Sequence, residues 1–218
     1  ADVHVGTHVR AYVEGIIADQ AGREAGPRPI DANHGDLLDA FIDVHGDVGA
    51  PGGAGCCLEV GARLGRFEMN FGKQRVIGAF DWANTRRSYD GAGAWAKGPT
   101  WRLDGWVARP VVVEADEFDE PNDGDADALF AGLYYANTAR SDLKWDAYLT
   151  VLDRDAVKWL ATTIEDETRW TLGLRGDGPI GGSRFDWDAE AAWQFGSFGD
   201  QSISAGMVTA EIGWKPCV

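Results

Sequence analysis

The sequence is poor in the residues that metal sites, disulfide frameworks and nucleic-acid interfaces require. Its 218 residues include three cysteines and four histidines, and none of them has the spacing of a zinc ligand set. Lys and Arg together number 20 against 35 Asp and Glu, which gives a formal net charge of −15. A chain with this balance offers no strong basic patch to phosphates, so nucleic acid is not expected as a partner.

Long apolar runs and helical periodicity are also missing. Without a run of about 18 apolar residues a transmembrane helix is excluded, but a membrane barrel is not, because its strands are only half apolar. No secretory leader is recognisable at Ala1, so a mature protein or a fragment is expected. No Ser-His-Asp or Cys-His arrangement stands out. We therefore expect no enzyme, no catalytic residues, no metal and no cofactor.

The sequence does contain a repeated alternation of apolar and polar residues. The segment 143–151 is the clearest, with Leu, Trp, Ala, Leu and Val at its odd positions. Side chains alternate sides along a strand, so such a segment has one apolar and one polar face. About ten candidate strands of this kind occur, near 2–14, 36–48, 57–66, 89–97, 101–109, 129–135, 143–151, 169–175, 185–194 and 208–214.

The connections between these segments alternate in length. Long ones are expected at 15–35, 67–88, 110–126 and 153–165, and shorter ones at 49–55, 98–99, 138–141, 177–183 and 196–200. Outer-membrane barrels have long external loops and short periplasmic turns. The pattern predicts one domain, residues 1–218, folded as an antiparallel transmembrane β-barrel of about ten strands in a bacterial outer membrane. A soluble sandwich or barrel with tryptophans in its core is the alternative.

The two faces of the strands predict two environments. The apolar face should contact lipid or detergent, with tryptophans in girdles near both ends. The polar face should line the lumen, where mixed charges form either an open path or a plugging network of ion pairs. The lumen-facing candidates are Arg10, Glu14, Asp39, Asp43, Arg63, Arg102, Asp104, Lys144, Asp146, Arg169, Arg175, Asp188 and Glu190.

Residues 59–110 add a resemblance to a known family. The stretch 71–78 reads FGKQRVIG and 81–91 reads DWANTRRSYDG, and the segment 26–31 reads GPRPID. These segments resemble the alginate export family of bacterial outer-membrane barrels, whose members are longer. The resemblance implies a pore for passive passage or export of a polysaccharide or small solute. The acidic balance departs from it, because a conduit for an anionic polymer should have a basic lumen.

Two other functions stay open. A structural or engineered barrel with a closed lumen would transport nothing, and a soluble barrel with exposed tryptophans would bind sugars. For the pore, the basic residues Lys73, Arg75, Arg86 and Arg87 within one long loop are candidates for an anion-attracting constriction. They could instead pair with Asp81, Asp90 and nearby lumenal acids and hold the loop in place.

Two further features lead to smaller expectations. The segment 114–127 is rich in Asp and Glu, and it lacks the spacing of a calcium loop, so a solvated external loop is favoured. If the last strand closes against the first, Cys217 could reach Cys56 or Cys57 and form a periplasmic disulfide. Three unpaired thiols are the alternative.

Overall fold

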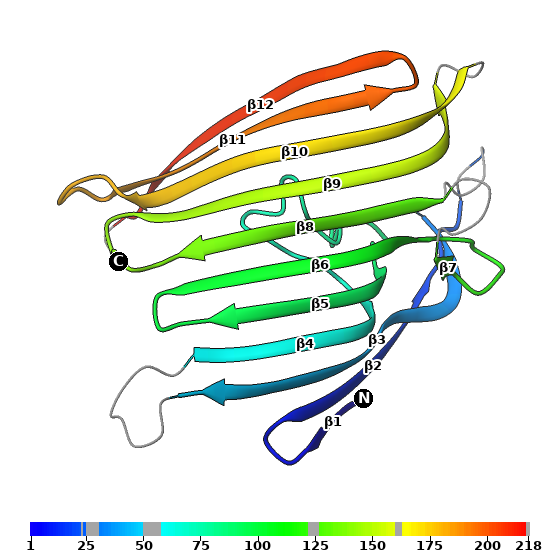
Figure 1. Ribbon diagram of the computed structural model, residues 1–218, viewed down its shortest axis with the longest axis horizontal. Helices are drawn as coiled ribbons and strands as arrows, with labels where there is room; N and C mark the ends of the chain where they lie inside the picture. The colour runs from blue at the N-terminus through cyan, green and yellow to red at the C-terminus, as the bar shows by residue number, and fades with distance from the viewer. Residues whose placement is uncertain (23, 25–30, 50–57, 122–126, 160–162, 217–218) are drawn as a thin grey trace.

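The computed structural model describes residues 1–22, 24, 31–49, 58–121, 127–159 and 163–216, and within them the protein is all-β (Figure 1). The strands form one antiparallel sheet in chain order, with β7 paired to β6 beside the main path. They are β1 (Asp2–Val5), β2 (Val9–Ala18), β3 (Asn33–Val48), β4 (Leu58–Phe67), β5 (Tyr89–Lys97), β6 (Trp101–Val112), β7 (Glu120–Pro121), β8 (Ala128–Asn137), β9 (Lys144–Trp159), β10 (Thr163–Pro179), β11 (Phe185–Phe198) and β12 (Gln201–Trp214).

The sheet is curved, and its two faces follow the predicted alternation. In β9 and β10, Leu149 lies opposite Leu172, whereas Tyr148 lies opposite Gly173. Leu149 and Leu172 are 37% and 52% exposed on the convex face, and Tyr148 is 4% exposed on the concave face. The apolar face therefore points out of the curved sheet, as a lipid-facing wall requires.

Tryptophans collect near both ends of the convex face. One group lies beside the short connections at 98–100, 138–143 and 180–184 and comprises Trp101, Trp145, Trp187 and Trp214. Toward the other end, the rings of Trp193 and Phe195 have centroids 5.0 Å apart, and Trp170 stacks on Phe195 at 6.5 Å. Aromatic rings favour the two membrane–water interfaces, so this distribution suits a bilayer-spanning wall.

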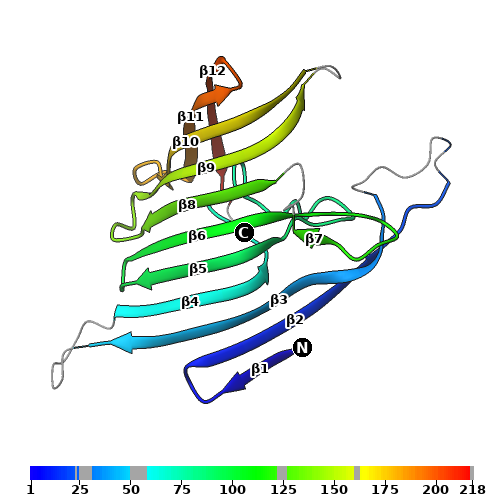
Figure 2. The same cartoon turned by 45° about the vertical axis from the view of Figure 1, so that its right-hand side comes forward.

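The sheet is open, and the predicted pairing of the last strand with the first is not formed (Figure 2). The first predicted strand, 2–14, is in fact two strands, because Gly6, with a φ of +64°, begins a turn that reverses the chain. β1 then folds back along β2 and occupies the edge where a closing strand would pair. Among the described residues, no strand pairs with the outer edge of β12.

Connection lengths alternate over only part of the chain. The predicted long connection 153–165 is wrong, because β9 continues to Trp159 and β10 begins at Thr163. This segment carries polar side chains at both phases, which removes the alternation by which a strand is recognised. Among the described residues, ten strands have nine residues or more, and the other two, β1 and β7, have four and two.

The connection between β4 and β5, residues 68–88, folds against the concave face (Figure 1). We call it the inward loop. Its Met69 and Ile77 are 4% and 3% exposed and belong to a core that includes Trp106 and Phe130 of the wall. Burial of these apolar groups anchors the loop inside the curve of the sheet.

The part of the chain described here contains no helix long and apolar enough to cross a membrane. Cys56, Cys57 and Cys217 lie outside the described residues, and so does the disulfide predicted between them.

Candidate pore constriction

The tip of the inward loop is seated on aromatic rings of the wall. Phe71 stacks on Trp106 and Tyr134, with ring centroids 5.1 and 4.6 Å apart. The next residue, Gly72, has a φ of +56°, and a Cβ there would lie 2.8 Å from the Tyr134 hydroxyl oxygen. Only glycine allows both this backbone conformation and this close approach. The stretch that follows is thereby directed toward β10, β11 and β12.

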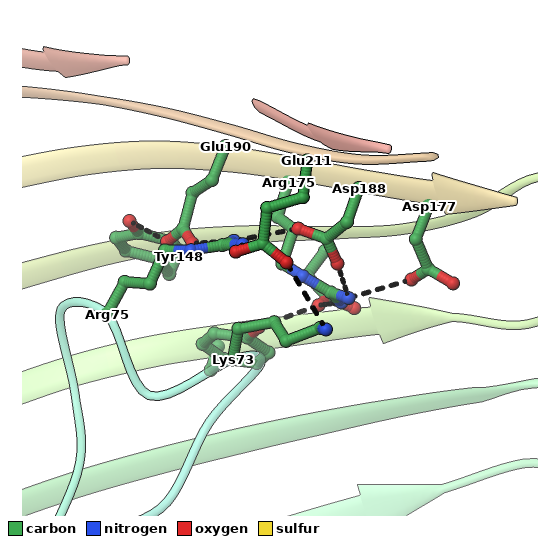
Figure 3. Close-up of polar contacts among 10 residues, drawn as sticks. Lys73, Arg75, Tyr148, Arg175, Asp177, Asp188, Glu190 and Glu211 are labelled. Carbon is green, nitrogen blue, oxygen red and sulfur yellow. Dashed lines mark hydrogen bonds and ion pairs between the residues drawn. The ribbon is translucent and has the colours of Figure 1, made fainter. Parts of the chain in front are cut away.

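Arg75 joins the loop to the far side of the sheet (Figure 3). Its Nη1 lies 2.7 Å from Asp188 Oδ1 and 3.1 Å from Glu190 Oε2, and its Nη2 lies 2.5 Å from Glu211 Oε1. Lys73 Nζ lies 3.7 Å from Glu211 Oε2. The Arg75 side chain is 14% exposed, so these charge-assisted hydrogen bonds are only partly screened by water.

The acids that bind Arg75 are themselves fixed by residues of the wall. Arg175 donates to Asp188 and, from Nη1 at 2.9 Å, to Asp146 Oδ2. The Tyr148 hydroxyl donates to Glu190 Oε1 at 2.8 Å. The loop therefore binds a connected network that extends from β9 to β12, and this network neutralises Arg75 while it positions it.

The four basic residues predicted to form one constriction do not form one cluster. They are Lys73, Arg75, Arg86 and Arg87. The first two reach β11 and β12, whereas Arg86 pairs with Glu68 at 2.6 Å and Arg87 covers the Phe80 ring at 4.0 Å. Phe80, which lies between the two pairs in the sequence, has a left-handed backbone conformation with a φ of 58°. The predicted partner Asp90 binds Arg66 instead, at 2.7 Å.

Glu68 lies at the base of the inward loop in an acidic, largely buried setting. Its Oε2 accepts the bond from Arg86, and its Oε1 is buried with no hydrogen-bond partner among the described residues. Its backbone N–H donates to Asp39 Oδ1 at 2.9 Å. Burial raises the pKa of Glu68 to about 7; the charge of Arg86 opposes this rise, and the nearby Asp39 and Glu14 add to it.

The cross-strand register places the predicted lumen-facing residues on the concave face. They are Arg10, Glu14, Asp39, Asp43, Arg63, Arg102, Asp104, Lys144, Asp146, Arg169, Arg175, Asp188 and Glu190. Many of them pair with each other, as Arg63 does with Asp43 at 2.7 Å and Arg10 with Asp43 at 3.9 Å. The face is therefore highly charged but largely neutralised by short-range pairs.

The lumen-facing candidates do not include the aromatic residues that share this face. Three of them lie opposite glycines on neighbouring strands: Trp95 opposite Gly61, Trp106 opposite Gly132 and Tyr148 opposite Gly173. A Cβ on these glycines would lie 2.2, 2.5 and 2.0 Å from the ring, respectively. The rings thus occupy the space above a bare backbone and lie against the wall. The sequence contains these glycines and aromatic residues at positions of the same face, but they can be matched in pairs only when the register of the neighbouring strands is known.

The sequence predicts that the acidic segment 114–127 is a solvated external loop, and the structure corrects this in part. Asp119 is 4% exposed and accepts a hydrogen bond from Asn33 Nδ2 at 2.7 Å and another from the Glu114 backbone N–H at 2.7 Å. The segment is thereby tied to the start of β3. Asp116 fits the expectation better, because it is exposed and contacts His34 at 2.9 Å. Residues 122–126 lie outside the described residues.

Two cavities flank the tip of the inward loop. The first, of about 490 Å³, lies between loop residues 69–72 and the wall formed by β4, β5, β6 and β8. The second, of about 510 Å³, lies between Lys73 and the ends of β9, β10, β11 and β12. The loop thus divides the space inside the curved sheet.

An antiparallel sheet with an apolar convex face, a charged concave face and a loop folded against that concave face defines the wall of a membrane β-barrel pore. The chain belongs to the alginate export family, because the sequence model of that family, described as alginate export, matches residues 1–216. This family comprises outer-membrane β-barrels that form polysaccharide export pores, which confirms the predicted fold class and the function implied by the resemblance. The family is one of transport pores rather than enzymes. No curated protein and no solved structure matches the chain.

Proposed function

We propose that this chain lines a passage across a bacterial outer membrane, through which a polysaccharide or small solute moves passively along the concave face. The short connections face the periplasm and the long ones face outward, as in other outer-membrane barrels. Lipid contacts the convex face. No cofactor or nucleic acid takes part.

The observation that carries this proposal is the inward loop bound across the concave face. Phe71 is held by β6 and β8, and Arg75 is held by β11 and β12. A segment held at both sides of a passage sets its width. Lys73 and Arg75 therefore lie at the constriction, whereas Arg86 and Arg87 act at the base of the loop.

Single-channel recording in a planar bilayer tests the role of the loop. Replacing Arg75 with Gln removes the charge that Asp188, Glu190 and Glu211 share, so these acids repel one another and release the loop tip. We expect a larger or more variable conductance than in the unaltered protein.

The matched control is Arg140→Gln, because Arg140 is exposed and pairs with Asp142 of its own turn rather than with an acid that binds the loop. An Arg75→Gln protein with the same conductance as this control would show that the loop does not set the width. A protein that inserts into the bilayer but never conducts would support the closed-lumen barrel instead.

A further inference from the structure

The cavity of about 490 Å³ beside the inward loop has an aromatic platform at one side. Trp95 of β5 is partly exposed, and its ring covers Gly61, where a Cβ would lie 2.2 Å from the ring. Its indole Nε1–H donates to Glu59 Oε1 at 3.1 Å. The ring is thus fixed from behind and at its edge, and it lines the cavity together with Arg102, whose guanidinium carbon lies 5.7 Å from the ring centroid.

The two arginines that line this cavity already have acidic partners. Arg63 donates to both carboxylate oxygens of Asp43, at 2.7 and 2.8 Å. Arg102 donates to both oxygens of Asp104, at 2.7 Å to each in the shorter contacts. The lining includes three more acids, and each of them has a basic partner outside the lining: Glu59 pairs with Lys97, Glu68 with Arg86 and Asp146 with Arg175. Among the described residues, no other arginine or lysine lines the cavity. The cavity is therefore rich in carboxylate oxygens that can accept further hydrogen bonds, and neither of the described arginines that line it is free of an acidic partner.

The position of the cavity relates it to the passage. Trp95 lies close to the short turn at 98–100, and the opposite side of the cavity is formed by Phe71 and Gly72 of the inward loop. A polysaccharide that enters from the end with the short connections meets Trp95 before it reaches the inward loop.

We propose that this cavity is an entry subsite for a saccharide, and that it accepts an uncharged sugar unit in preference to a uronate. The proposal rests on the proposed function and narrows its substrate class. The C–H groups on one face of a pyranose carry partial positive charge and stack on the negative face of an aromatic ring. Sugar hydroxyls donate to the carboxylates at the rim. A uronate carboxylate would meet acids and no free cation to offset its desolvation.

Binding can be measured without transport. We would titrate the purified protein, in a detergent without a sugar headgroup, with an uncharged glucose hexasaccharide and with a hexauronate, and follow heat release by calorimetry. The uncharged oligosaccharide should bind more tightly. Trp95→Ala should weaken its binding by about tenfold, as expected for the loss of one aromatic contact surface, and Trp95→Phe should retain most of it.

Two further variants separate the subsite from general damage. Gly61→Ala should also weaken binding, because the new methyl group would displace the Trp95 ring. Trp214→Ala should not, because Trp214 is 61% exposed on the convex face. Tighter binding of the hexauronate, or equal binding by the Trp95→Ala and Trp214→Ala proteins, would overturn the proposal.

Conductance in a bilayer then separates this proposal from the proposed function. Binding without conductance would leave the subsite intact and refute the pore. Conductance without binding of the uncharged hexasaccharide would leave the pore intact and refute the subsite.

Discussion

Single residues on the concave face follow one construction rule: a large ring is set against a glycine of the neighbouring strand. Trp106 covers Gly132 and Tyr148 covers Gly173 in this way. Glycine usually weakens a strand, because it has no side chain to pack. Here the ring covers the exposed backbone and regains the packing. Both members of each pair are needed, so the glycines should be as sensitive to substitution as the rings.

Gly173→Ala tests this rule. Its Cβ would lie 2.0 Å from the Tyr148 ring, so the ring or the strand must move, and we expect a loss of about 1–3 kcal/mol in the free energy of unfolding. Denaturant unfolding of protein folded into lipid vesicles measures it. Gly206→Ala is the matched control, since its Cβ would approach nothing closer than Ala192 O at 3.7 Å. Equal losses in the two variants would contradict the rule.

Leu149 tests the membrane face. It lies on the convex face midway along the wall, and replacing it with Arg should reduce the free energy of unfolding by roughly 2–4 kcal/mol in vesicles. Leu129→Arg, on the same face but opposite Asp153 near a strand end, should lose much less. If both variants are as stable as the unaltered protein, water rather than hydrocarbon surrounds this face.

At the level of elements, the inward loop is the segment whose structure departs most from its sequence pattern. Its length and its basic residues were apparent, and they placed a candidate constriction within it. Its direction was not apparent, because Gln74 and Phe80 take left-handed backbone conformations that no simple residue rule predicts. Contacts with strands more than a hundred residues away in sequence, at Asp188 and Glu211, then decide which arginine faces the passage.

The docking of this loop should depend on pH through Glu68. Its pKa is raised from 4.5 to about 7 where it is buried, so the docked loop is favoured while Glu68 carries a proton. This contribution is fully present below the ordinary pKa and is lost as the pH rises through about 7. We expect the conductance to become larger or more variable as the pH is raised from about 4.5 to about 7, because the contribution is lost between these two pKa values.

Glu68→Gln should abolish this pH dependence and keep the loop docked at the higher pH. Glu117→Gln removes an exposed acid and serves as the control, so its pH dependence should equal that of the unaltered protein. A pH response that persists in Glu68→Gln would assign the effect to another group.

For the whole molecule, the balance of charge predicts the ion preference of the passage. The net charge is −15, and Lys73 and Arg75 face several acids at the constriction. We expect a reversal potential that indicates cation preference, stronger at low ionic strength because salt screens the lumenal charges. Replacing Lys73, Arg75, Arg86 and Arg87 together by Gln should increase that preference. An anion preference, or a reversal potential that the four replacements leave unchanged, would refute this account.

Alternation alone could predict the faces of the sheet and the course of most long strands, since one apolar and one polar face suffice to define a wall. It could not predict the edges. The turn at Gly6 divides the first strand, and the polar residues near 153–165 conceal the ends of β9 and β10. Edges and loop directions depend on pairing across long sequence distances, which a local pattern does not contain.

Because these rings lie over glycines, the affinity of the channel wall for a solute can be set independently of the width of the channel. A tryptophan that stood upright would take its own length from the cross-section, whereas Trp95 and Trp106 take little more than the thickness of a ring. The wall can therefore offer more aromatic contact surface to a solute without narrowing the channel. The width is set by the inward loop, which can change in sequence or position without any change in the strands that carry the rings.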